Sequence, residues 1–96
     1  MARIVVAPFA RDDLRDLIEI LKLPKNTRSR VRELIRILET APEAGAPLEG
    51  RWKGFRFILG PWPWMLIIYA YDHDADQVSV VTIQDARRAQ AATTSR

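Results

Sequence analysis

The chain has 96 residues, of which 48% are hydrophobic and 28% charged, and this balance predicts one globular domain with a single core. It contains no cysteine, which excludes disulfides and thiolate metal sites. Its net charge of +3, from 15 basic and 12 acidic residues, is a modest excess that suits a polyanionic partner.

The N-terminus and the longest uncharged run bear on localisation. Pro8 and the charges at residues 11–13 fall where a secretion signal would need an unbroken apolar stretch. The uncharged run from Phe57 to Tyr71 has 15 residues, fewer than the roughly 20 that a membrane-spanning helix needs, and two prolines would break it. We therefore expect a cytoplasmic protein that does not associate with membranes.

The N-terminal half reads as a strand and two helices. The β-branched residues of 3–7, bounded by Pro8, predict a strand. Apolar residues at helical spacing predict one helix from residue 8 or 10 to 23 and a second, capped by Thr27, from 27 to about 40. A loop of roughly four residues between them favours an antiparallel hairpin. The residues that set the two spacings are Leu14, Leu17, Ile18 and Leu21, then Val31, Leu34, Ile35 and Leu38.

The C-terminal half reads as three strands. Residues 54–60, 64–72 and 77–85 are short runs rich in β-branched and aromatic residues, separated by turn-forming sequences. The predicted fold class is therefore α+β: an N-terminal strand, a two-helix antiparallel hairpin and a three-stranded antiparallel meander, with both helices on one face of a small curved sheet. We expect a single domain over 1–96, a central strand at 66–68 that is covered on both faces, and a frayed tail at 89–96.

Several local signatures occur in an order that resembles the RelE/ParE superfamily, the toxins of bacterial type II toxin-antitoxin systems. The resemblance spans nearly the whole chain and implies a toxin that is neutralised by a small antitoxin, in a heteromeric complex. The signatures are Ala10 to Leu14 at a helix start, Ala41, Pro42 and Gly45 after the basic helix, Leu48 and Gly50, Gly54 to Arg56 at a strand entry, Ile67 to Tyr69 before an acidic turn, and Arg87 after the last strand.

The resemblance leaves the target and the catalytic status open. Members that cleave mRNA on the ribosome carry an arginine three residues before the strand tyrosine and a late tyrosine or histidine, whereas Leu66 and Thr93 stand at about those positions here. Arg56 and Arg87 match the two remaining groups and are the candidate catalytic or target-contacting residues. The ParE branch lacks the catalytic set and poisons DNA gyrase, so the absences favour that branch slightly.

Metal-free RNA cleavage needs a base, an acid and a cation for the phosphate. Arg56 and Arg87 could hold a phosphate, but arginine stays protonated and cannot act as the base. The remaining acid-base candidates are Glu49, Tyr69, Tyr71 and His73, and Tyr69 and Tyr71 share a strand face where packing is the commoner role. The aspartate-rich turn around His73 is typical of a strand connection, so we expect no metal and no cofactor.

Two clusters of residues are candidate partner-binding sites, and each could instead have a purely structural role. Arg28, Arg32 and Arg36 lie four residues apart and form a basic stripe, either an ordinary solvated helix face or a surface for an antitoxin or nucleic acid. Trp62 and Trp64 lie in a proline-containing connection between two predicted strands. They could cap the core or form an apolar patch that anchors the antitoxin.

A third cluster is the sequence RWKGFR. Trp52 and Lys53 beside Arg56 suit base stacking with phosphate contacts, as does Arg88 beside Arg87, although Trp52 could equally pack over the sheet. The resemblance to the RelE/ParE superfamily implies a toxin that acts on translation or on DNA gyrase. The alternative is a non-toxic binding module that keeps the fold, an adaptor for nucleic acid or protein.

Overall fold

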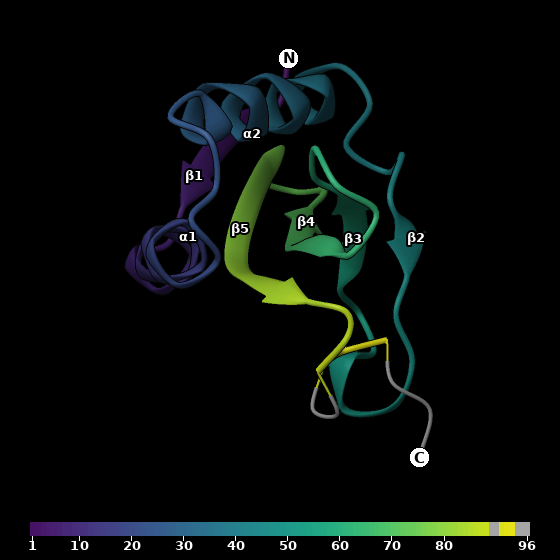
Figure 1. Ribbon diagram of the computed structural model, residues 1–96. Helices are drawn as coiled ribbons and strands as arrows, with labels where there is room; N and C mark the ends of the chain where they lie inside the picture. The colour runs from purple at the N-terminus through teal and green to yellow at the C-terminus, as the bar shows by residue number, and fades with distance from the viewer. Residues whose placement is uncertain (89–90, 94–96) are drawn as a thin grey trace.

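The computed structural model describes residues 1–88 and 91–93, which form two α-helices and one five-stranded sheet. The sheet order is β1-β5-β4-β3-β2, with β1 parallel to β5 and the other pairs antiparallel (Figure 1). The elements are β1 (Arg3–Val6), α1 (Pro8–Leu21), α2 (Thr27–Arg36) with the 3-10 turn η1 (Ile37–Glu39), β2 (Ala46–Pro47), the 3-10 turn η2 (Gly50–Trp52), β3 (Arg56–Leu59), β4 (Met65–Asp72) and β5 (Gln77–Asp85). The predicted α+β class and the predicted helix and strand order are confirmed.

The helices begin and end for local reasons. Pro8 stands at the start of α1, where its missing N–H costs nothing, and Lys22 ends the helix in a left-handed conformation with φ of 52°. Thr27 is not the N-cap that the sequence predicted. It is the first residue of α2 and is buried, and its hydroxyl donates to the Pro24 carbonyl oxygen at 2.7 Å. Helix α2 also ends at Arg36, earlier than predicted, because the chain tightens into η1.

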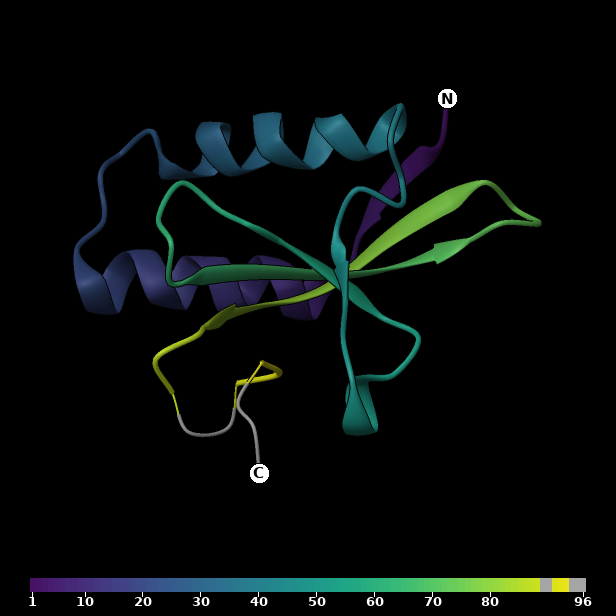
Figure 2. The same cartoon turned by 90° about the vertical axis from the view of Figure 1, so that its right-hand side faces the viewer.

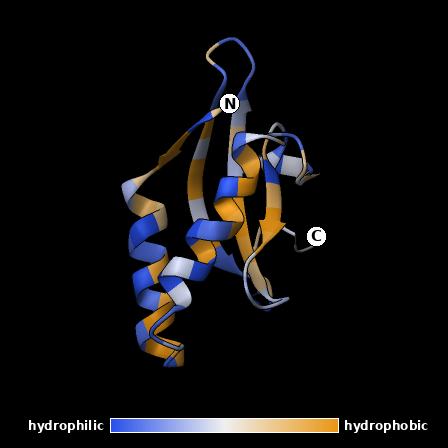
Figure 3. Ribbon diagram, turned by 90° about the horizontal axis from the view of Figure 1, so that it is seen from above, coloured by the Kyte–Doolittle hydropathy of each residue, from blue (hydrophilic) through white to orange (hydrophobic). Residues whose placement is uncertain are grey.

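The helices cover one face of the sheet. Figure 2 shows α1 and α2 running in opposite directions, and Figure 3 shows hydrophobic and hydrophilic segments alternating along both helices. Leu14 and Ile35 from the helices pack in one buried cluster with Ile67, Tyr69 and Val80 from the sheet. Burial of such aliphatic side chains, about 1.5–3 kcal/mol each, is the main force that holds the two layers together.

The opposite face of the sheet is also covered. Leu66 and Ile68 point away from the helices into a second buried cluster with Leu48 and Ala91. Partly buried residues complete this far-face cluster: Trp52, Phe55, Phe57, Val81, Ala86 and Ala92. Strand β4 is therefore buried on both faces, which confirms the prediction for residues 66–68.

Two features of the sheet were not predicted from the sequence. Strand β2 has only two residues, one of them proline, within a segment that reads as a loop. The parallel pairing of β1 with β5 joins residues more than 70 positions apart, such as Arg3 with Gln77. The predicted fraying of residues 89–96 falls largely outside the described residues.

Candidate functional site

The basic stripe of α2 borders a hollow between the two helices. Arg28, Arg32 and Arg36 line it from α2, and Arg11 adds a fourth arginine from α1. The hollow has a volume of about 520 Å³, and its apolar lining is Ile4, Val6, Ala10, Leu14, Val31, Ile35 and Ile83. Glu39, which lies 3.8 Å from the Arg36 guanidinium, is the one acidic residue in the described lining. We call this feature the basic groove.

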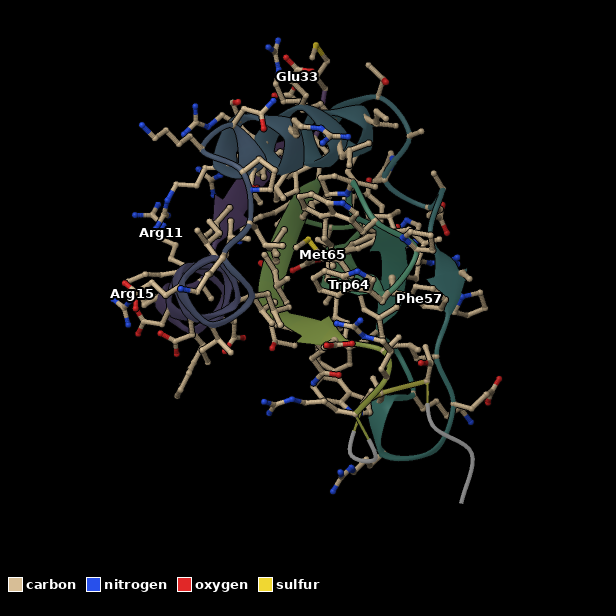
Figure 4. The ribbon with its side chains drawn as sticks, viewed as in Figure 1. Arg11, Arg15, Glu33, Phe57, Trp64 and Met65 are labelled. Atoms are coloured by element: carbon tan, nitrogen blue, oxygen red, sulfur yellow. The ribbon has the colours of Figure 1, made fainter. Side chains whose placement is uncertain are left out.

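Sequence reasoning identified three of these arginines but missed Arg11. The stripe follows from spacing within one helix, whereas Arg11 joins it only because the hairpin places α1 beside α2. Figure 4 shows Arg11 and Arg15 projecting from α1 on the outer side of the molecule. An apolar floor with four cations at its rim suits an amphipathic, acidic partner.

Trp62 and Trp64 form the middle of a four-membered stack. Their rings lie 5.9 Å apart between centroids and only 14° from parallel. The Arg30 guanidinium lies 5.3 Å from the Trp62 ring, and the Arg87 guanidinium lies 4.6 Å from the Trp64 ring. We call this feature the Arg-Trp stack. It joins α2, the β3–β4 connection and the turn after β5, and its Arg30 contact could not be read from local sequence.

Arg87 is held by a neighbouring carboxylate as well as by Trp64. Its Nε and Nη2 atoms donate to the two carboxylate oxygens of Asp85 at 2.9 and 2.8 Å. This hydrogen bonding lowers the pKa of Asp85 and raises the pKa of Arg87. The arrangement fixes the guanidinium in one orientation and satisfies part of its hydrogen-bonding capacity within the protein.

Arg56, the other candidate catalytic arginine, contacts a different part of the molecule. Its Nη1 atom donates to the Gly45 carbonyl oxygen at 2.8 Å, and its Nη2 atom lies 3.6 Å from a carboxylate oxygen of Glu43. In the sheet, Arg56 stands opposite Tyr69 of β4. Asp85, the partner of Arg87, stands opposite Met65, which is four residues from Tyr69 along β4. That offset is about 13 Å along the strand. Among residues 1–88 and 91–93, Arg56 and Arg87 therefore share no side-chain partner.

The position expected to carry the catalytic arginine lies in a core. Leu66 is 2% exposed and belongs to the far-face cluster. The side chain at this position therefore packs among apolar neighbours and does not face solvent. Thr93, at the position of the expected late aromatic residue, is exposed.

Three of the four acid-base candidates lie near Arg56: Tyr69 stands opposite it in the sheet, His73 shares the Glu43 carboxylate with it, and the Tyr71 ring lies 4.7 Å from the His73 ring. Tyr69 is fully buried, its hydroxyl accepts the Gly45 N–H at 2.9 Å, and burial raises its pKa, so it is not a base at neutral pH. The Tyr71 hydroxyl donates to Asp76 at 2.7 Å, and this bond raises its pKa. His73 is exposed and lies 3.6 Å from Glu43, whereas Glu49 is exposed beside η2.

The residues expected to bind nucleic acid, Trp52, Lys53 and Arg88, lie in different surroundings. Trp52 meets Phe55 edge to face at 5.5 Å and packs into the far-face cluster, while Lys53 is exposed. The Trp52 indole nitrogen is buried with no hydrogen-bond partner among the described residues. Arg88 lines a separate hollow beneath α1, which includes Asp13 and Asp16.

Within residues 1–88 and 91–93, no group of three or more histidine or acidic side chains is placed to hold a metal ion. The same residues contain no helix with the length and apolar character required to span a membrane.

Comparison with known proteins gives the fold a context. No protein-family model matches the sequence, and no curated protein matches it. Solved structures do match. The toxin-antitoxin complex RelBE2 from Mycobacterium tuberculosis contains a chain 21% identical to this one, with a TM-score of 0.68 over 88% of this chain and 96% of that chain.

Two further solved structures agree. The intact RelBE toxin-antitoxin complex of E. coli matches at 15% identity and a TM-score of 0.68, over 92% of this chain and 100% of that chain. The YoeB/ParE toxin from Agrobacterium tumefaciens matches at 17% identity and a TM-score of 0.67, over 86% and 96% of the two chains. The chain therefore has the fold of the RelE/ParE toxins, as the sequence resemblance predicted.

Proposed function

We propose that this chain is the toxin of a type II toxin-antitoxin pair. The observation that carries the proposal is the fold, because the matched structures are toxins or toxin-antitoxin complexes and nearly the whole length of each matched chain is covered. The basic groove is the feature of this chain that adds support, because it suits an acidic partner.

The proposed antitoxin site is the basic groove. An acidic amphipathic helix suits it, with apolar residues over the half-buried Ile4 and Val6 and carboxylates near Arg28, Arg32 and Arg36. Charge complementarity of this kind speeds association and selects the partner more than it adds raw affinity. The proposal for Trp62 and Trp64 as antitoxin anchors is weaker, because arginine guanidinium groups already cover ring faces of both residues.

We further propose that the toxin acts by binding its target, not by cleaving mRNA. Leu66 is packed in a core, and Arg56 and Arg87 have separate intramolecular partners. Arg56 does lie close to Glu43 and His73, but neither Leu66 nor Arg87 belongs to that group among the described residues, so the arginine pair expected for RNA cleavage is not assembled there. The family resemblance suggests DNA gyrase as a target that such a toxin would bind without cleaving RNA.

Controlled expression of the chain in bacteria tests both proposals. We expect growth to stop on induction and to resume when the cognate antitoxin is expressed as well. A reporter of DNA damage should respond, while the rate of protein synthesis should fall only later. An early halt in protein synthesis that Arg56→Ala removes would instead support ribosomal mRNA cleavage.

Harmless expression without any antitoxin would contradict the toxin proposal. It would favour the alternative of a non-toxic binding module, for which the basic groove would be the interaction surface.

A further inference from the structure

The Arg-Trp stack offers chemistry that the proposed function does not use. Its two indole rings are nearly parallel, and cations from distant segments lie at both ends. Figure 4 shows Trp64 in front of the sheet, on the connection between β3 and β4. Aromatic faces bordered by arginines are the ordinary elements of single-stranded nucleic acid binding.

The two ends of the stack differ in how firmly they are held. Arg87 is fixed on Trp64 by two hydrogen bonds to Asp85. Arg30 is exposed, and within residues 1–88 and 91–93 it forms no ion pair, so its contact with Trp62 is its one recorded side-chain interaction. Trp62 is half-buried and packs against the cluster on the helix side of the sheet, so the ring face under Arg30 is the part of the stack that a ligand can take over.

Typical interaction energies favour a nucleobase over the Arg30 guanidinium on the face of Trp62. A cation on a partly buried tryptophan contributes about two- to thirtyfold to an equilibrium constant. A base stacked on an aromatic side chain contributes about five- to a hundredfold. The displaced guanidinium would then be free to pair with the phosphate beside that base, which replaces its lost contact.

We propose that the Arg-Trp stack is a binding site for single-stranded nucleic acid. One base stacks on the ring face of Trp62 under Arg30, the Trp62–Trp64 pair supports it, and Arg30 moves onto the adjoining phosphate. The proposal is independent of the toxin's target, because it concerns binding by the purified chain alone.

Fluorescence anisotropy with a labelled uridine octanucleotide tests the site. Trp62→Leu should weaken binding at least about fivefold, because it removes the stacking face and keeps the charge. Arg30→Ala should weaken binding and reduce the slope of log affinity against log salt by about 0.7. The matched control is Arg3→Ala, which removes the same charge beside Gln77, at the end of β5 remote from Arg87, and should leave the affinity within about twofold.

A second measurement needs no variant and decides the matter if Trp62→Leu fails to fold. An abasic oligonucleotide of equal length and charge should bind the unmodified protein at least about fivefold more weakly than the uridine octanucleotide. Equal binding of the two ligands would overturn the proposal, as would equal losses for Arg30→Ala and Arg3→Ala. It would also be overturned if neither oligonucleotide bound.

Discussion

Leu66→Arg introduces the side chain that RNA-cleaving members of the family would carry at this position. The substitution tests whether this face of the sheet is a packed core or an open cleft. Leu66 is 2% exposed among Leu48, Ile68 and Ala91. The substitution removes leucine burial of about 1.5–3 kcal/mol. It also places a guanidinium in an apolar cluster, which costs several kcal/mol even after the side chain bends toward solvent. We expect a total loss of about 4 kcal/mol or more, against a total stability of about 5–15 kcal/mol for such a domain.

The matched control is Leu59→Arg. Leu59 stands directly opposite Leu66 in the sheet and on the same face, yet it is 46% exposed. The same change there should alter stability by no more than about 0.5 kcal/mol. Urea denaturation followed by circular dichroism measures both losses, and the melting temperature of Leu66→Arg should fall by more than about 15 °C. Equal, small effects at the two positions would refute the assignment of Leu66 to a core.

Three further predictions concern other parts of the molecule. Gly45→Ala should destabilise the fold by about 1–3 kcal/mol in urea denaturation, because a Cβ atom would lie 2.7 Å from the Tyr69 hydroxyl, and an unchanged midpoint would contradict this crowding. Since hydrogen bonding to Arg87 lowers the pKa of Asp85 in the folded state, its carboxylate should stabilise the protein above about pH 4 and lose that effect as the pH falls further. The difference in melting temperature between wild type and Asp85→Asn should therefore shrink on acidification, and a constant difference would count against the pairing. Arg32→Glu should weaken antitoxin binding at least about tenfold in calorimetry, and an unchanged affinity would move the antitoxin away from the basic groove.

Sequence reasoning recovered the elements whose signals are local. Strand β5 was predicted at its observed bounds, residues 77–85, because turn-forming sequence precedes it and its composition is strongly β-branched. Helices α1 and α2 followed from the spacing of their apolar residues, although the end of α2 was misplaced because the switch to a 3-10 turn depends on packing. The basic stripe was predicted for the same reason, since it lies within a single helix.

Features that depend on tertiary placement could not be predicted in this way. The alternation of Arg56 with Phe57 indicated two faces but not which face the helices cover, so the contact of Arg56 with Glu43 and Gly45 was unforeseen. Arg30 reaches Trp62 from another element, and no periodicity links the two positions. The family resemblance indicated that Leu66 replaces an arginine, but only the structure shows that the position is buried.

The most direct test of toxicity without RNA cleavage is a map of the 5′ ends of cellular mRNA in cells arrested by induction of this chain. We predict growth arrest with no new 5′ ends within coding regions. New ends that appear on induction, and disappear when Arg56 is replaced by alanine, would contradict the account.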